Sequence, residues 1–360
     1  MLFVRGLGGG WETERVQQID EEVLDQRAQI LLPAAPTVTA TEHDMAGETD
    51  VNLPKMSIAG YAWIPTHGRR RRGMLISMYD AEIVDACRRR GIGGSPTAVL
   101  EDGDFTDAER REIPVATGTS HAVFIRAEDA GAAGLPAFSL RFFTSEGELP
   151  ACGHGTVAAM ALLAVRAPQP DDEYRAVLRT GNRRFDGWAV REDGRLTASF
   201  DPGPVSLRAA ETDELGAVAA GLGLDDAAIA GSPCVASVGR ERLLLPVRSR
   251  AALAGLTPDF AALRAACDRH GFLGCYVYSV PGGDGSAAAR MFAPSIGVPE
   301  DVANANSTGC LAAHLAEQGL TRLSVDMGDG LGSPSTITAT VHDEPGGRRI
   351  RLGGEAAPRA

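Results

Sequence analysis

The sequence predicts an α+β fold of two similar domains, each with a β-sheet and one Ala-rich helix. Short apolar runs separated by Gly, Pro and Asp are typical of strands. Two Ala-rich segments, 156–165 and 311–319, interrupt these runs with helical composition. The residues before these segments resemble each other at a constant offset, which indicates an internal duplication. A chain of 360 residues with 44% hydrophobic residues is long enough for two such domains.

The first 73 residues differ in composition from the rest and predict a disordered extension. They contain three glycines at 8–10, four arginines at 69–72 and one short helical pattern at 16–30. Nothing in them would build a hydrophobic core. Met74 and Met78 are therefore alternative candidates for the start of translation.

The predicted strands begin at Met78. They cover 79–87, 97–100, 122–126 and 138–143. The predicted domains are residues 74–205 and 206–345, followed by a final strand and tail at 346–360. The duplication is clearest before the two helices, where Arg141, Phe143 and Pro150 match Arg290, Phe292 and Pro299.

Composition excludes several classes of function. A net charge of −12 argues against nonspecific binding to nucleic acid. The one lysine, Lys55, lies in the predicted extension, which argues against Schiff-base chemistry. The six cysteines are scattered and no secretory signal precedes them, as expected for free thiols in the cytoplasm. No apolar stretch is long enough to span a bilayer, so no membrane partner is expected.

Each predicted helix begins in a small polar loop that suits an anionic substrate. The free N–H groups and the partial positive charge of a helix N-terminus attract carboxylates. The groups at these loops that can transfer protons are Cys152 and His154 at the first, and Glu300 and Asp301 at the second. His121, just before an apolar strand, is a further candidate. The seven histidines lack the spacing of a metal site, so neither a metal nor a coenzyme is predicted.

Every candidate also has a purely structural interpretation. Cys152 is compatible with a small buried side chain, and Asp301 with a helix N-cap. His121 and His154 are compatible with hydrogen-bonded core residues. A two-thiol racemase would need a second cysteine in the matching loop, and residues 304–307 contain none.

From residue 78 to about 354 the chain resembles the PhzF-like isomerases, which are relatives of diaminopimelate epimerase. The resemblance rests on ordered motifs and not on any single one. These are Gly94-Ser95-Pro96-Thr97-Ala98-Val99, Thr119-Ser120-His121-Ala122-Val123-Phe124, Arg141-Phe142-Phe143-Thr144, Cys152-Gly153-His154-Gly155-Thr156, Phe292-Ala293-Pro294, Gly297-Val298-Pro299-Glu300-Asp301 and Gly332-Ser333-Pro334-Ser335.

The resemblance implies two pseudo-symmetric domains, each a curled sheet around a central helix, with the active site between them. It also implies cofactor-independent isomerisation by proton transfer. The chain departs from the family where the acid/base glutamate is replaced by His121. The Thr-Gly-Ser-Ala loop of the family is Asn304-Ala305-Asn306-Ser307 here. This altered set looks like the branch associated with lincomycin and pyrrolobenzodiazepine pathways, which implies a double-bond shift in a pyrroline carboxylate.

The predicted function is therefore an isomerase of a small cyclic amino or imino acid in secondary metabolism. The predicted catalytic residues are His121, His154 and Asp301, and the predicted binding residues are Cys152, Gly153, Gly155, Asn304, Asn306 and Ser307. The expected partner is a small carboxylate substrate, and a homodimer is compatible with the sequence. Two alternatives remain open: a Cys-dependent racemase, epimerase or dehydratase of a proline-like acid, and an inactive homologue that binds a metabolite.

Overall fold

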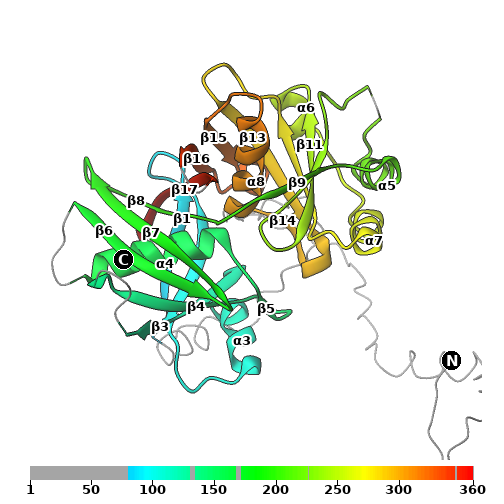
Figure 1. Cartoon of the computed structure of the whole chain (residues 1–360). Coiled ribbons are helices and arrows are strands. Elements are labelled where there is room, and N and C mark those ends of the chain that lie inside the picture. The colour runs from blue at the N-terminus through cyan, green and yellow to red at the C-terminus, as the bar shows by residue number, and fades with distance from the viewer. Residues whose placement is uncertain (1–79, 130–133, 168–171, 226, 345–346, 360) are drawn as a thin grey trace, which may run out of the picture. The chain divides into compact units, whose positions relative to one another are not determined.

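Figure 1 shows a computed structural model of the chain, in which residues 80–129, 134–167, 172–225, 227–344 and 347–359 are described. These residues belong to one compact unit. The predicted extension, residues 1–73, and the two alternative start methionines lie outside the described residues. No helix in the described part is both long and apolar enough to cross a membrane.

The first half of the described chain forms a closed ring of strands. β1 pairs with β2, and the ring continues through β3, β4, β6, β7 and β8, with β5 added at the edge of β4. The C-terminal strand β17 closes the ring, because it pairs with both β8 and β1. The strands are β1 (Glu82–Arg88), β2 (Ser95–Glu101), β3 (His121–Glu128), β4 (Ala137–Phe143), β5 (Glu148–Leu149), β6 (Glu173–Thr180), β7 (Arg183–Glu192), β8 (Arg195–Phe200) and β17 (Gly347–Pro358).

Helix α4 (Gly153–Arg166) runs through this ring and contacts β1, β2, β3, β7, β8 and β17. Its sequence is apolar on nearly all sides, with small Ala residues and Met160, Leu162 and Val157. A helix that is apolar all round is stable only when protein surrounds it. The helix predicted at 156–165 is thus confirmed, and it begins three residues earlier than expected because Cys152 is its N-cap.

The second half places helix α8 (Ala305–Ala316) against another run of strands. α8 contacts β16 and β17 most, and also β9, β10, β11 and β15. The helix predicted at 311–319 begins six residues earlier, because Asn304 caps it and Asn306 to Thr308 belong to its first turn. The strands are β9 (Ser206–Ala209), β10 (Cys234–Ser237), β11 (Glu241–Val247), β12 (Cys275–Ser279), β13 (Ser286–Ala293), β14 (Val298–Asp301), β15 (Arg322–Met327) and β16 (Ser335–Glu344).

The two halves repeat the same order of strand pairing. β2 is parallel to β3, which is followed by antiparallel β4, and β11 is parallel to β12, which is followed by antiparallel β13. The matched arginines also behave alike: the guanidinium of Arg141 lies 5.0 Å from the Phe143 ring centre, and that of Arg290 lies 4.8 Å from the Phe292 ring centre. The fold is a sheet-rich α+β fold, as predicted. That its halves form two pseudo-symmetric domains with the predicted boundaries stays a prediction.

Four helices outside the sheets were not predicted. α3 covers β2, β3 and β4, while α6 contacts β11, β12 and β13 and α5 packs against α7 (Figure 1). They are short helices, of five to eleven residues each. Their bounds are α3 (Asp107–Thr117), α5 (Thr212–Leu222), α6 (Arg250–Ala254) and α7 (Phe260–His270).

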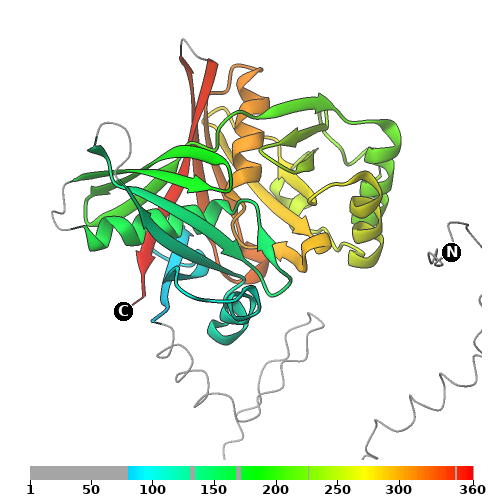
Figure 2. The same cartoon turned by 60° about the horizontal axis from the view of Figure 1, so that its bottom comes forward.

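Strand β17 connects the two halves. Besides β1 and β8 it pairs along most of its length with β16, and it contacts both α4 and α8. In Figure 2 this pair of strands (red) runs between the α4 side of the molecule and α8 (orange). The largest hydrophobic core cluster accordingly contains residues from both helices, such as Met160 and Leu311, and from β17, such as Leu352.

Candidate active site

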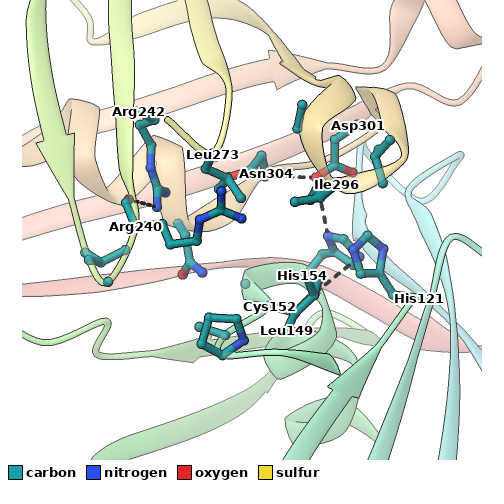
Figure 3. A pocket seen from close by; sticks show the side chains of 18 of the residues that line it. His121, Leu149, Cys152, His154, Arg240, Arg242, Leu273, Ile296, Asp301 and Asn304 are labelled. Atoms are coloured by element: carbon teal, nitrogen blue, oxygen red, sulfur yellow. Dashed lines mark hydrogen bonds and ion pairs between the residues drawn. The ribbon is translucent and has the colours of Figure 1, made fainter. Parts of the chain in front are cut away.

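A pocket of about 110 Å³ lies where α4 and α8 begin, and the turn between β10 and β11 lines it from another side. Its wall contains His121 from the start of β3, His154 from α4 and Asp301 from the end of β14. Leu149 and Ile296 are among its apolar lining residues (Figure 3). The pocket therefore combines polar groups from several elements with an apolar lining, as ligand sites do.

The two helices begin in close contact. A Cβ atom on Gly153 would lie only 2.7 Å from the Cβ of Ala305 and 2.8 Å from the Asn306 nitrogen, so only glycine fits here. The Nδ1 atom of His154 lies 2.8 Å from the carbonyl oxygen of Ala303, just before α8. Because both N-termini carry partial positive charge, their meeting favours an anion in this part of the pocket.

The side chains of His121 and His154 meet edge to face. Their ring centres are 4.4 Å apart and their planes are inclined by 81°. The side chains are almost inaccessible to solvent, at 3% and 2% exposure. The Nδ1 atom of His121 is 2.8 Å from the Ser120 hydroxyl. Figure 3 shows Asp301 beside this pair. The three residues predicted to be catalytic therefore lie together.

The surroundings shift the pKa values of His121 and His154 in opposite directions. Burial, and then the charge of His154, lower the pKa of His121 well below its usual value. Burial also opposes a charge on His154. The neighbouring Cys152 and Asp301 nevertheless outweigh burial, with help from the Ala303 carbonyl, and raise the pKa of His154 to about 10. At neutral pH the pair thus holds a neutral His121 next to a protonated His154.

Asp301 is held in position by the loop that leads into α8. Its Oδ2 atom lies 3.9 Å from Nδ1 of His154 and accepts a 2.9 Å hydrogen bond from the side-chain amide of Asn304. Asp301 is not the N-cap of the helix. That role belongs to Asn304, whose Oδ1 accepts from the Ser307 amide at 2.9 Å. Both the nitrogen and the oxygen of the Asn304 side-chain amide are therefore hydrogen-bonded within the protein.

Cys152 caps α4 and also faces the histidines. Its sulfur lies 3.4 Å from the Gly155 amide nitrogen and 3.5 Å from Nε2 of His154. It is the one cysteine in the lining of this pocket within the described part of the chain.

The side chains of His121, Cys152 and His154 together form a set of metal-ligand types, which the spacing of the histidines in the sequence did not suggest. One donor atom each of His121, Cys152 and His154 lies within 4.8 Å of the others. Imidazole and thiolate are ligands that zinc prefers. The spacing could not reveal this set, because His121 comes from a different element than the other two.

Gly155 and Ser307 were predicted to bind substrate, but the structure does not place them in the lining. Gly155 lies behind Cys152, where a Cβ would be 2.9 Å from a methyl group of Val123. Ser307 is fully buried, and its hydroxyl is 3.3 Å from an Nη1 atom of Arg242. The other predicted binding residues, Cys152, Gly153, Asn304 and Asn306, do line the pocket.

Three arginines in the lining were not predicted. Arg183 begins β7, Arg240 lies in the turn after β10, and Arg242 is the second residue of β11. No motif or spacing relates Arg183 to the other two, because β7 and β11 belong to different sheets and only tertiary contacts bring them together. Arg183 donates a 2.9 Å hydrogen bond to the Val238 carbonyl, which joins β7 to that turn. Asp301 is the one acidic residue in the pocket lining among the described residues, so the lining is strongly cationic.

Comparison with known families agrees with this architecture. The sequence profile of the PhzC-PhzF family, described as phenazine biosynthesis-like protein, matches residues 84–360. An uncharacterized isomerase of Salmonella typhimurium is 28% identical over 264 residues, which cover 69% of this chain and 85% of the relative. The trans-2,3-dihydro-3-hydroxyanthranilate isomerase of Pseudomonas aeruginosa is 29% identical over 287 residues, covering 76% and 93% of the two chains.

A solved structure supports the same relationship. The structure of a predicted epimerase from Pseudomonas aeruginosa has a TM-score of 0.65 to this chain at 27% identity. It covers 78% of this chain and 96% of its own. The fold is thus similar over nearly the whole of that protein.

Proposed function

Because the chain belongs to the PhzC-PhzF family of isomerases, we propose that it moves a proton, and with it a double bond, within a small cyclic amino or imino carboxylate. The proposed substrate class is a pyrroline carboxylate, and the proposed setting is secondary metabolism of the antibiotic type. These two points rest on the motifs around His121 and at Asn304-Ala305-Asn306-Ser307, which look like those of the branch associated with lincomycin and pyrrolobenzodiazepine pathways. No metal or coenzyme has a role in the proposed reaction.

One observation carries the proposal: two buried histidines in contact whose proton affinities are driven apart. A pair of titratable groups with separated pKa values is the arrangement expected of an acid and a base that work together. The 4.4 Å contact of the rings places both within reach of one small molecule. Neutral His121 is suited to accept a proton from carbon, and protonated His154 is suited to stabilise negative charge.

In the proposed reaction, His121 removes a proton from a carbon next to the conjugated system. The electron pair of that C–H bond shifts along the system, and the double bond moves by one position. Protonated His154, held by Asp301 and the Ala303 carbonyl, stabilises the negative charge of the intermediate. His121 then returns the proton to the other end of the system. Protons and electrons balance without a further reactant.

The positive character of the pocket supports a carboxylate substrate. Gly153 and Asn306 lie in the first turns of two helices, where free amide groups suit an anion. The single acidic residue in the described lining, Asp301, is engaged with His154 and Asn304. The substrate carboxylate would therefore bind at these helix N-termini, where no carboxylate of the described protein competes for the same amide groups.

The test is hydrogen exchange in heavy water, followed by NMR with 1-pyrroline-2-carboxylate as the probe. We expect enzyme-dependent incorporation of deuterium at ring carbon beyond the uncatalysed rate. The variant His121→Gln, which keeps a polar side chain of similar size, should incorporate deuterium about 10²- to 10⁴-fold more slowly. If the wild-type chain binds the probe but adds no deuterium, the protein is an inactive metabolite-binding homologue.

The Cys-dependent racemase remains a second candidate because Cys152 lies 3.5 Å from His154. A thiolate beside an imidazolium would be an effective base. In a racemase of this kind, alkylation of Cys152 by iodoacetamide should abolish exchange at the carbon that bears the carboxylate. In the proposed isomerase, Cys152→Ala should retain most of the exchange activity below neutral pH and lose it at a lower alkaline limit than the wild type, because Cys152 also raises the pKa of His154.

A further inference from the structure

The side chain of Arg242 is a buried cation without a carboxylate partner. It is 2% exposed and lines the active-site pocket. Its Nη1 atom is 3.3 Å from the Ser307 hydroxyl and its Nη2 atom donates a 2.8 Å hydrogen bond to the Arg240 carbonyl. The Nε atom is buried and has no hydrogen-bond partner in the described part of the chain. Both of its partners are neutral groups.

Arg110, the other buried arginine of the described residues, has the carboxylate partners that Arg242 lacks. Arg110 is 5% exposed and is paired with Asp102 at 2.7 Å and Asp107 at 3.1 Å. Burying a charge is unfavourable unless an opposite charge or several hydrogen bonds compensate it. Arginine keeps its charge inside proteins, so deprotonation cannot relieve Arg242. A negatively charged ligand in the pocket would supply the missing partner.

Arg242 has two cationic neighbours in the same wall. Neither Arg183 nor Arg240 pairs with a carboxylate among the described residues, although Arg183 donates to backbone carbonyls of Val238 and Pro202. Figure 3 places Arg240 and Arg242 on one side of the pocket and His121 with His154 on the other. The arginines are therefore set apart from the proton-transfer pair.

The two helix N-termini already provide a place for one carboxylate next to the histidines. The arginines form a second cationic region, contributed by β7, β11 and the turn before β11. We infer that the substrate carries a second acidic group, a carboxylate, and that Arg242 binds it together with Arg183 and Arg240. This inference rests on the proposed function. The planar guanidinium groups match a carboxylate in shape and charge. The substrate class is thus a small cyclic dicarboxylate.

Two planar probes test this inference by isothermal titration calorimetry on the full chain: pyrrole-2-carboxylate and pyrrole-2,4-dicarboxylate. We expect the dicarboxylate to bind at least about tenfold more tightly, since hydrogen bonds to charged groups contribute about that much or more. In Arg242→Met the preference should fall to about threefold or less. Arg264→Met, which removes an exposed arginine of α7, should keep it. Equal affinities in the wild type, or an unchanged preference in Arg242→Met, overturn the inference.

Two further arms keep the test decisive. If Arg242→Met does not fold by circular dichroism, Arg240→Met at the exposed turn must lower the preference by about threefold, and an unchanged preference counts against the inference. A pyrrole-2-carboxylate with a phosphonate at position 4 is the third probe; if it binds more tightly than the dicarboxylate, the second group is not a carboxylate. Binding needs no turnover, so these results are independent of whether deuterium exchange occurs.

Discussion

Replacing Asp301 by Asn should shift the alkaline limit of activity. The Oδ2 atom of Asp301 lies 3.9 Å from Nδ1 of His154. Two unit charges at this distance attract each other by about 4 kcal/mol at an effective dielectric constant of about 20. That energy corresponds to about three pH units. Asparagine is isosteric and can still accept the hydrogen bond from Asn304, so the geometry of the loop should survive.

The sign of the effect follows from the proposed role of His154. The wild type needs His154 protonated, so exchange activity should persist through neutral pH and be lost as the pH rises through about 10. Without the carboxylate, this loss should begin about three pH units lower, near neutrality. Because folding raises the pKa of His154, the protonation of this residue also stabilises the folded state. This contribution to the free energy of unfolding is fully present below the ordinary pKa of a histidine and is lost as the pH rises through about 10.

The measurement is deuterium incorporation into 1-pyrroline-2-carboxylate across the alkaline range, with histidine titration by NMR on the same samples. Asp268→Asn is the matched control, because it removes one negative charge from the exposed surface of α7. The electrostatic reasoning is refuted if Asp301→Asn keeps the alkaline limit of the wild type while its fold is intact. It is also refuted if Asp268→Asn shifts the limit equally.

Three other changes give separate tests. His121→Gln should reduce exchange by about 10²- to 10⁴-fold, measured by NMR, and near wild-type exchange would remove His121 from the mechanism. Below neutral pH, where His154 is protonated without the help of Cys152, Cys152→Ala should retain exchange within about tenfold, whereas complete loss there would favour the racemase. Gly153→Ala should lower the free energy of unfolding by about 1–3 kcal/mol in urea titrations, because its Cβ would meet Ala305; an unchanged midpoint would contradict this.

The inner part of the fold could be predicted because its sequence patterns are strong. Apolar runs marked the strands before α4, and Ala-rich composition marked α4 and α8. The outer helices were missed although they carry local signals: Thr106 and Glu109 form a capping box at the start of α3, and Asp259 caps α7. Pro114 within α3 obscured the helical pattern, since proline is unfavourable in a helix interior.

The site could be predicted only where its residues are close in sequence to a motif. His154 and Asp301 follow from the two helix entries, and His121 from its place just before an apolar strand, while its role as the acid/base residue follows from the resemblance to a family motif. Arg183 and Arg242 had no such signal. They are separated by a long stretch of chain and lie in strands that do not pair with each other; the hydrogen bond from Arg183 to the Val238 carbonyl joins the two segments. An arginine in an unremarkable strand cannot be distinguished from a surface residue without tertiary contacts.

The pairing of β17 with β1 has a consequence for how this protein is made. Asp85 and Arg359 form an ion pair across 274 positions of sequence, next to the ladder that closes the ring around α4. The ring cannot close during synthesis until the residues of β17 have left the ribosome, and α4 then stays partly uncovered. Contacts so distant in sequence form slowly. We therefore expect nascent chains that lack β17 to expose the apolar surface of α4 and to depend on chaperones until that strand arrives.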